Sequence, residues 1–494
     1  MQKKQKRFFL GLIILIILIV LFTYYSELKT KNSNSDNLPL SPGSKNSRIQ
    51  EDDSTNSKNL FEINPELTIE FVGPERLATL HISPKSAIDQ QNSKPTTTPQ
   101  INANVISPSI VQPKPLDSCT TPKFLDGNIN ASIYQTRPDI KGRYVVWEEM
   151  DNSSYDPKIK GYDLGQDKKF NTTDDGGLIT LYNRQSGIYM DTHSPRVNDQ
   201  GKVIFNAISF NGAYLLTCTF SNCQNTIQVL DIMVPSSGQI FFLSRFLHQD
   251  ISNNTAISVK DDYNTTKSSL IKYDLTTGLS TTLMAINVGR YPNIDLITSA
   301  HIDNNGIITA AKITGPFTAP INQDAYFFLA NNNSPIPIRS IAFNSLSQDW
   351  SRAYQFGTEI VTLFENPDAL ISSWTHYPLD IWYRIYQNSL SNPVAIYKDN
   401  GIDERATRAT FNSKTQKFVI AFISKQLPPS PVTIKTMSYN AQTKTFTDYK
   451  SIPLPSGYTN YYFGELDDFN VVSETTNRIN STTNNLYRII ISEC

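Results

Sequence analysis

The chain is poor in charged side chains, which make up 18% of its 494 residues, against about a quarter in an average soluble protein. Its 44 basic and 45 acidic residues almost cancel, so the formal net charge is −1. A protein that binds nucleic acid through its general surface carries a surplus of basic residues. We therefore expect no nucleic-acid partner.

The short motifs of common enzyme classes are also missing. The sequence contains no Gly-x-Ser-x-Gly, His-Glu-x-x-His, Gly-x-x-x-x-Gly-Lys-[Ser/Thr], Gly-x-Gly-x-x-Gly or Cys-x-x-Cys. Its histidines are scattered, and no two have the spacing of a metal-binding pair. They are His81, His193, His248, His301 and His376. We predict no cofactor and no metal, name no catalytic residue, and leave enzymatic activity open.

Acidic residues gather at Glu148, Glu149, Asp151 and Asp156, directly after an apolar run. Carboxylate oxygens at that density are able to bind calcium. The segment lacks the regular Asp-x-Asp-x-Asp-Gly pattern, and aspartate is common in turns because its side chain bonds to nearby backbone. Solvated turns are therefore the preferred interpretation.

The N-terminal residues have the pattern of a membrane anchor. Residues 1–7 are basic, and residues 8–25 are apolar almost throughout. As a helix this segment would be about 27 Å long, enough to span the hydrocarbon core. The basic tail should stay in the cytoplasm, which places the remaining chain outside. A cleaved signal peptide is the alternative, but no small-x-small cleavage site follows directly.

Residues 26–115 are dense in Asn, Ser, Thr, Pro, Lys and Gln. Such a segment cannot bury enough apolar surface to offset the entropy lost on ordering, so we expect a disordered stalk. One part, residues 67–72, alternates like a strand, and its role is open.

Residues 116–494 have an all-β pattern, because short apolar runs alternate with turn clusters and helical periodicity is nearly absent. Residues 137–164 give the repeating unit. A short strand reaches a turn at Gly142, and the apolar run 144–147 follows. After a polar loop, residues 159–162 alternate as a half-exposed outer strand does.

The outer strand recurs around Tyr273, Tyr386 and Tyr439. Successive gaps, starting from Tyr162, are 111, 113 and 53 residues, so the first two are close to twice the third. Strand-like segments fill the midpoints, and one more lies at residues 486–491. Seven units of about 55 residues fit, a length that suits four-stranded propeller blades. We predict a seven-bladed β-propeller, with six blades as the runner-up.

Pro138-Asp139-Ile140 before Gly142, followed by Tyr162-Asp163-Leu164, resembles the TolB-like or WD40-like propeller repeats of bacterial cell-envelope proteins. The usual Ser-Pro-Asp-Gly turn is approximated by residues 198–201. Propellers host enzymes, binders and scaffolds alike, so the resemblance implies a fold and no activity. The last unit ends at the chain terminus, and we expect residues 124–133 to supply its outermost strand and close the ring.

The four cysteines are Cys119, Cys218, Cys223 and Cys494, all beyond the apolar segment. An even number in an extracytoplasmic chain permits disulfides. Of the three possible pairings we favour Cys218 with Cys223, across a local turn, and Cys119 with Cys494. The second pair would tie the start of the propeller to its last strand. Four unpaired thiols are the alternative.

Aromatic residues cluster in two places. Trp374 and Trp382 lie in the fifth unit, and Tyr458, Tyr461 and Tyr462 precede the seventh. Aromatic loops are common in carbohydrate and protein recognition, although packing between blades also accounts for aromatic residues. The tyrosines of residues 456–462 do not alternate as strand residues do, so this loop is the best binding candidate.

The leading hypothesis is a binding or scaffolding module for a protein or an envelope glycan, held at loops on one face of the ring. The alternative is a propeller-type glycosidase or lyase with carboxylates near the central channel. An enzyme should gather acids, histidine or arginine on the inner strands of several blades. A binder should have a bland channel.

Overall fold

The computed structural model describes residues 68–70, 79–81, 118–126, 133–151, 156–183, 191–209, 212–234, 245–262, 265–288, 296–314, 322–338, 351–367, 379–397, 402–426, 432–455, 458, 460–477 and 486–494. The expected tail 1–7, the expected span 8–25 and most of the expected stalk 26–115 lie outside these residues. Among the described residues, no helix is long and apolar enough to cross a membrane. Within the stalk, β1 (Thr68–Glu70) pairs with β2 (Thr79–His81).

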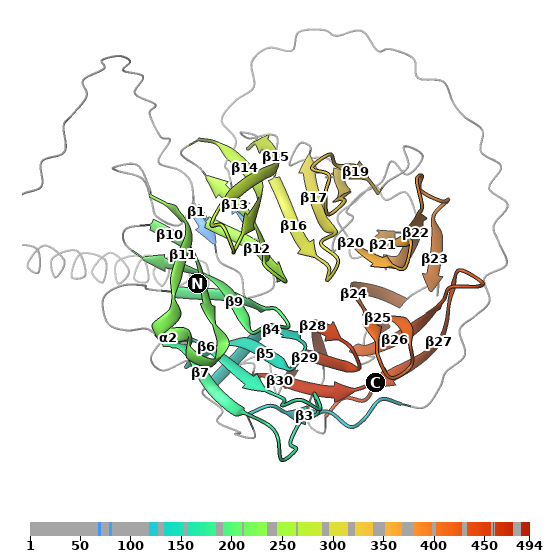
Figure 1. Ribbon diagram of the computed structural model, residues 1–494. Helices are drawn as coiled ribbons and strands as arrows, with labels where there is room; N and C mark the ends of the chain where they lie inside the picture. The colour runs from blue at the N-terminus through green and yellow to red at the C-terminus, as the bar shows by residue number, and fades with distance from the viewer. Residues whose placement is uncertain are drawn as a thin grey trace, which may run out of the picture. The chain divides into compact units, whose positions relative to one another are not determined.

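Seven four-stranded antiparallel sheets follow one another around a ring and form a seven-bladed β-propeller (Figure 1). Each blade uses four strands in sequence order from its innermost to its outermost strand, except the last. Blade 1 comprises β4 (Ile133–Lys141), β5 (Tyr144–Asp151), β6 (Asp156–Asp163) and β7 (Gly177–Asn183). Blade 2 comprises β8 (Asp191–Val197), β9 (Lys202–Ser209), β10 (Gly212–Thr219) and β11 (Gln228–Met233). Blade 3 comprises β12 (Arg245–Ser252), β13 (Thr255–Asp262), β14 (Lys267–Asp274) and β15 (Ser280–Asn287).

The remaining four blades repeat this order. Blade 4 comprises β16 (Leu296–Ile302), β17 (Ile308–Thr314), β18 (Asn322–Phe328) and β19 (Ile336–Pro337). Blade 5 comprises β20 (Arg352–Phe356), β21 (Glu359–Pro367), β22 (Leu379–Tyr386) and β23 (Val394–Tyr397). Blade 6 comprises β24 (Ile402–Asn412), β25 (Lys417–Gln426), β26 (Val432–Asn440) and β27 (Thr445–Ile452). Blade 7 comprises β28 (Asn460–Asp467), β29 (Asn470–Asn477), β30 (Leu486–Glu493) and β3 (Lys123–Phe124).

The hydrophobic core lies between the blades. Seven clusters of buried apolar side chains fill the seven interfaces, one between each pair of neighbouring blades. Six of the seven apolar second strands contribute to two clusters each, because their side chains point alternately to the two faces of the sheet. In β5, Val146 packs towards blade 2 while Val145 and Trp147 pack towards blade 7. No blade therefore buries its apolar surface without its neighbours.

The ring is closed by a strand from the beginning of the domain, as the sequence predicts. In blade 7, Lys123 pairs with Ile491 and Phe124 pairs with Ile490. The closing strand is shorter than expected and begins one residue earlier. Ile133, expected at its end, begins β4 of blade 1 instead. Closure in this way removes the open seam that an unpaired edge of blade 7 would leave.

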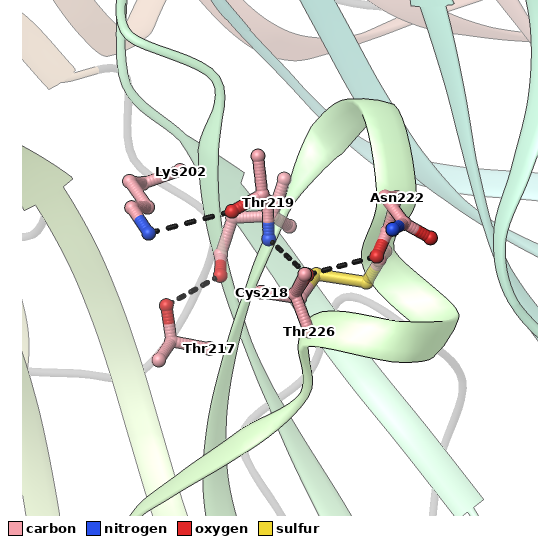
Figure 2. Close-up of a disulfide and its surroundings, with 8 residues drawn as sticks. Lys202, Thr217, Cys218, Thr219, Asn222 and Thr226 are labelled. Carbon is pink, nitrogen blue, oxygen red and sulfur yellow. Dashed lines mark hydrogen bonds between the residues drawn. A yellow bond between two sulfur atoms is a disulfide. The ribbon is translucent and has the colours of Figure 1, made fainter.

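Both favoured disulfides are present. Cys119 is bonded to Cys494 with a Cα–Cα distance of 4.6 Å, and Cys218 to Cys223 with 4.9 Å. The short pair encloses η1 (Phe220–Asn222), and its second cysteine is the first residue of α2 (Cys223–Thr226), between β10 and β11 (Figure 2). The hydroxyl of Thr226 accepts the backbone N–H of Thr219 at 2.9 Å and donates to the carbonyl of Asn222 at 2.8 Å.

One assignment within the blades needs correction. The strands that contain Tyr162, Tyr273, Tyr386 and Tyr439 are the third strands β6, β14, β22 and β26, not the outermost strands. The outermost strands have little apolar pattern, as in β15, where most side chains are exposed. A strand with one free edge and one solvated face buries few residues, which explains why its sequence resembles a turn region.

Candidate functional site

Each of the seven innermost strands contributes an ionisable side chain to a set of groups that interact electrostatically. We call this set the charged ring. It consists of Asp139 on β4, Arg196 on β8, Asp250 on β12, His301 on β16, Arg352 on β20, Arg408 on β24 and Glu465 on β28. Electrostatic interactions join members of blades that are not neighbours, such as His301 with Glu465 and Asp250 with Arg352. The ring contains three carboxyl groups, three guanidinium groups and one imidazole.

β-Bulges set the position of several members. In blades 1, 2 and 3 the register of the innermost strand shifts just before Asp139, Arg196 and Asp250. The residue two places earlier has a left-handed backbone in each case, with φ values of 52° at Arg137, 53° at Ser194 and 48° at His248. A bulge adds one residue to a strand and re-aims the side chains that follow it. Similar shifts precede Arg408 and Glu465.

Two pairs within the charged ring are in direct contact. Arg408 Nε donates to Glu465 Oε2 at 2.9 Å, and His301 Nδ1 lies 2.7 Å from Asp250 Oδ2. Both pairs bridge neighbouring blades. Charge-assisted contacts of this kind are stronger than neutral hydrogen bonds, and burial increases their strength.

The ring carboxylates also bind backbone groups of the next blade. Asp139 Oδ2 accepts the N–H of Val197 at 2.7 Å, and Asp250 Oδ2 accepts the N–H of Ile302 at 3.0 Å. The carboxylate of Asp303 accepts the N–H of Gln355, and the carboxylate of Asp467 accepts the N–H of Gly142, both at 2.8 Å. These contacts hold the innermost strands in register, so part of the role of Asp139 and Asp250 is structural.

Asp139 is the most perturbed acid of the charged ring. Burial raises its pKa from 3.8 to about 7, and the negative charges of Glu465 and Asp250 act in the same direction, against Arg196 and the Val197 N–H. A carboxyl group with a pKa near neutrality is able to take up and release a proton at physiological pH.

His301 is neutral at pH 7. Burial lowers its pKa from 6.5 to about 4, because it outweighs the opposing effect of Asp250, and Arg352 lowers the pKa further. Since the carboxylate of Asp250 only accepts, the Nδ1–H of His301 donates to it. The other ring nitrogen, Nε2, is buried and has no hydrogen-bond partner among the described residues. The ring of Tyr354, whose hydroxyl is likewise buried without such a partner, lies 5.0 Å away between centroids.

The aromatic residues named as binding candidates do not form one described surface. Tyr458 is half-buried, with its ring 5.3 Å from that of Phe124 in the closing strand. Trp382 packs against the cluster between blades 4 and 5. Tyr461 and Tyr462 belong to β28 rather than to a loop, and their side chains lie outside the described part of the chain. Trp374 also lies outside it. Ligand binding by these five residues stays a prediction.

The acidic residues considered for calcium are placed differently from the expected turns. Glu148 and Glu149 lie within β5, where Glu148 pairs with Arg137 at 3.0 Å and Glu149 with Lys160 at 3.5 Å. A second acidic group lies in the turn between β6 and β7, where carboxylate oxygens of three residues come within 4.8 Å of one another. These residues are Asp167, Asp174 and Asp175. They accept hydrogen bonds from backbone and threonine groups of the same turn.

The sequence reasoning missed the charged ring, although a signal is present. Its seven members follow one another at intervals of 51 to 57 residues, which is the length of one blade. In all seven blades a buried apolar residue comes directly after the ionisable one; in blades 5 and 6 it is Ala353 and Ala409, and in the other five blades it is larger. The larger residues are Ile140, Val197, Ile251, Ile302 and Leu466. The charged ring could have been predicted from this pattern: once per blade, an ionisable residue precedes an apolar residue and a turn.

Comparison with known proteins supports the fold and gives no evidence of function. No family model and no curated protein matches the chain. Solved structures do, and this chain has a weak structural resemblance to TolB and other β-propeller proteins. The β-propeller domain of the Trilobed protease from Pyrococcus furiosus is 10% identical, with a TM-score of 0.43, covering 76% of this chain and 94% of that one. TolB from Acinetobacter baumannii is 9% identical, with a TM-score of 0.31, covering 73% and 78%.

Peptidases with propellers also match. A puromycin-hydrolysing peptidase from Mycobacterium tuberculosis is 11% identical, with a TM-score of 0.43, covering 74% of this chain. The chain spans about half the length of that peptidase, since 52% of it is covered. At such identities the similarity concerns the fold and says nothing of activity.

Proposed function

We propose that this chain is a membrane-tethered, extracytoplasmic propeller that binds a protein or an envelope glycan. In this proposal residues 1–7 are a cytoplasmic tail, residues 8–25 cross the membrane, and residues 26–115 hold the propeller away from it. The apolar segment and the polar composition of the stalk support this organisation. The two disulfides support an oxidising compartment, where such bonds persist.

The charged ring does not meet the expectation of a bland channel for a binder; what supports a binding role is that its charged groups are paired with one another. Arg408–Glu465 and Asp250–His301 are in direct contact, and the ammonium of Lys141 on β4 also interacts with the carboxyl groups of Asp139, Asp250 and Glu465. These contacts link blades near the centre of the ring, and the closing strand and the Cys119–Cys494 disulfide fasten its outer edge at blade 7, so together they make the propeller a rigid support. Rigid scaffolds suit recognition, because little conformational freedom is lost when a ligand binds.

The binding role is tested with the full-length protein in lipid nanodiscs. We expect saturable co-sedimentation with isolated, protein-free envelope glycan, or a defined cross-link to one envelope protein. A variant with serine at both Cys119 and Cys494 tests the contribution of the rigid ring, and it should bind more weakly. Absence of both glycan binding and a specific cross-link would overturn the proposal.

The compartment is tested by thiol labelling in intact cells. We expect the four cysteines to resist alkylation until a reductant is added, and an added protease to cleave within residues 26–115 without cell lysis. Free thiols together with protection from the protease would place the domain inside the cell and contradict the proposal.

A second candidate function is acid–base catalysis on a glycan at the charged ring. It is favoured by one arrangement: ionisable groups on all seven innermost strands, including Asp139 with its pKa raised to about 7 and the oriented His301. The release of reducing ends from isolated envelope glycan measures it. Loss of release in Asp139→Asn, but not in Asp199→Asn on an exposed turn, would support catalysis. No release by the unmodified protein would exclude it for that glycan.

A further inference from the structure

A cavity of about 390 Å³ lies between blades 4 and 5, away from the charged ring. Its walls come from the turn between β18 and β19, the turn between β20 and β21, and the residues that follow β22. Ligand pockets for small molecules begin at about 300 Å³. The cavity therefore lies at the lower end of the size range of small-molecule sites.

The floor of the cavity is apolar. Ile307 and Ile360 are buried members of the cluster between the two blades, and Leu329 and Tyr386 pack against that cluster. The ring of Tyr386 is held edge-on by Phe327, with centroids 5.2 Å apart. A fixed aromatic ring beside aliphatic side chains offers a surface for the C–H face of a ligand.

The rim is rich in amide side chains, and three of them are held in orientation by hydrogen bonds within the protein. Gln355 and Gln387 donate their N–H groups to Gly357 O at 3.2 Å and to Glu359 Oε1 at 2.7 Å. Their carbonyl oxygens are left as acceptors. Asn332 accepts the N–H of Ser334 at 2.9 Å, which leaves its amino group as a donor. The rim therefore presents donors and acceptors side by side.

No charged side chain lines the cavity. The nearest acid along the chain, Glu359, is already paired with Lys444 at 2.8 Å. The ammonium of Lys272 donates to the carbonyl oxygen of the lining residue Ala330 at 3.4 Å, so an anionic ligand would lose its hydration with only this one cation, itself already hydrogen-bonded, nearby. A ligand with hydroxyl groups, which both donate and accept, matches the rim without that penalty.

The backbone at the rim is strained at one residue. Asn388 has a φ of 145°, in the region that glycine alone adopts without strain. Asn388 is one of the residues that line the cavity. Strained non-glycine residues persist mainly where function requires their side chains.

We propose that this amide cavity binds a neutral saccharide, with the apolar face of one sugar ring against Tyr386 and its hydroxyl groups on the rim amides. The inference rests on the proposed function and narrows its partner to a glycan. A short peptide offers backbone N–H and C=O groups to the same amides, but it brings charged termini or side chains to a site that carries none.

Saturation-transfer NMR and calorimetry on the full-length protein in nanodiscs test the proposal. The probes are di-N-acetylchitobiose, cellobiose, a digalacturonate and a neutral blocked tripeptide. We expect a neutral disaccharide to bind, and the double variant Asn332→Ala, Gln355→Ala to weaken binding about tenfold, as the loss of two hydrogen bonds implies. The matched control, Asn254→Ala, removes an exposed amide from a turn of blade 3 and should leave the affinity unchanged.

A second variant separates binding from folding. Asn388→Gly relieves the backbone, so it should raise the melting temperature while it lowers saccharide affinity. Equal affinities in the variants and the control, or preference for digalacturonate or the tripeptide, would overturn the inference. If envelope glycan co-sediments but no disaccharide binds, the inference fails while the proposed function stands. If neither glycan nor protein partner binds, the proposed function itself fails.

Discussion

The two disulfides enclose loops of very different length, and the entropy of the unfolded chain predicts unequal contributions to stability. The separation is 375 residues for Cys119–Cys494 and 5 residues for Cys218–Cys223. The loop-closure relation gives upper estimates of about 6 and about 2 kcal/mol. With an unfolding entropy of about 2.1 cal/mol/K per residue, these losses lower the melting temperature of the propeller by about 7 °C and about 3 °C.

The assay compares double serine variants at Cys119 and Cys494 and at Cys218 and Cys223. Melting is followed by tryptophan fluorescence, to which the fully buried Trp147 contributes. The comparison is demanding because the short pair is the more deeply buried, with both sulfurs inside the cluster between blades 1 and 2. If packing dominated, the short pair would therefore matter more. A larger or equal loss in its variant would refute the ring-closure argument.

Three further predictions concern stability, each measured by urea unfolding. Deletion of residues 116–133 removes the closing strand β3 and should destabilise the whole propeller, and an unchanged cooperative transition would contradict this. The pKa of His301 falls from 6.5 to about 4 on folding, so the folded state binds fewer protons between these values. Stability should therefore be full above pH 6.5 and fall by about 1–3 kcal/mol as the pH drops to about 4; His301→Gln should show a shallower fall. Gly212→Ala should cost more than about 2 kcal/mol, because φ is 147° and an added Cβ would lie 2.2 Å from Met233 O. Gly278→Ala, with φ of 72° and open space, is its control and should cost about 1 kcal/mol.

The fold was predictable because its signal repeats. Tyr162, Tyr273, Tyr386 and Tyr439 all occupy third strands, so their spacing measured the blade length correctly even though the strands were taken for outermost ones. The disulfide pairing followed from the same reasoning, since a ring must join its first and last segments. The outermost strands were missed because they bury few side chains, as β15 illustrates.

The charged ring was not predicted, for a physical reason. Its members differ in chemical type, and no two are close in sequence; only closure of the ring brings Asp139 within reach of Glu465. The cavity rim has the same origin, because Gln355 and Asn332 meet only when blades 4 and 5 pack together. The sequence near each of these residues therefore gives no sign of either contact.

Seven blades cannot carry charges that alternate in sign all the way round, because seven is odd. In this ring the neutral His301 lies between Asp250 and Arg352. Two pairs of neighbours carry charges of the same sign: Arg352 beside Arg408, and Glu465 beside Asp139. Their effects are visible in the pKa values: burial and Arg408 lower that of Arg352 to about 10, and burial and Glu465 raise that of Asp139 to about 7.

The imbalance allows a ligand at the ring to be distinguished from one in the amide cavity. A cationic group near Asp139 would lower its pKa and release a proton, whereas an anionic group would raise the pKa and take one up. A neutral saccharide between blades 4 and 5 should leave the pKa of Asp139 unchanged. Calorimetry at pH 7 in two buffers of different ionisation enthalpy measures this proton exchange. Equal binding enthalpies in both buffers agree with the amide cavity, and a difference that disappears in Asp139→Asn would move the binding site to the charged ring.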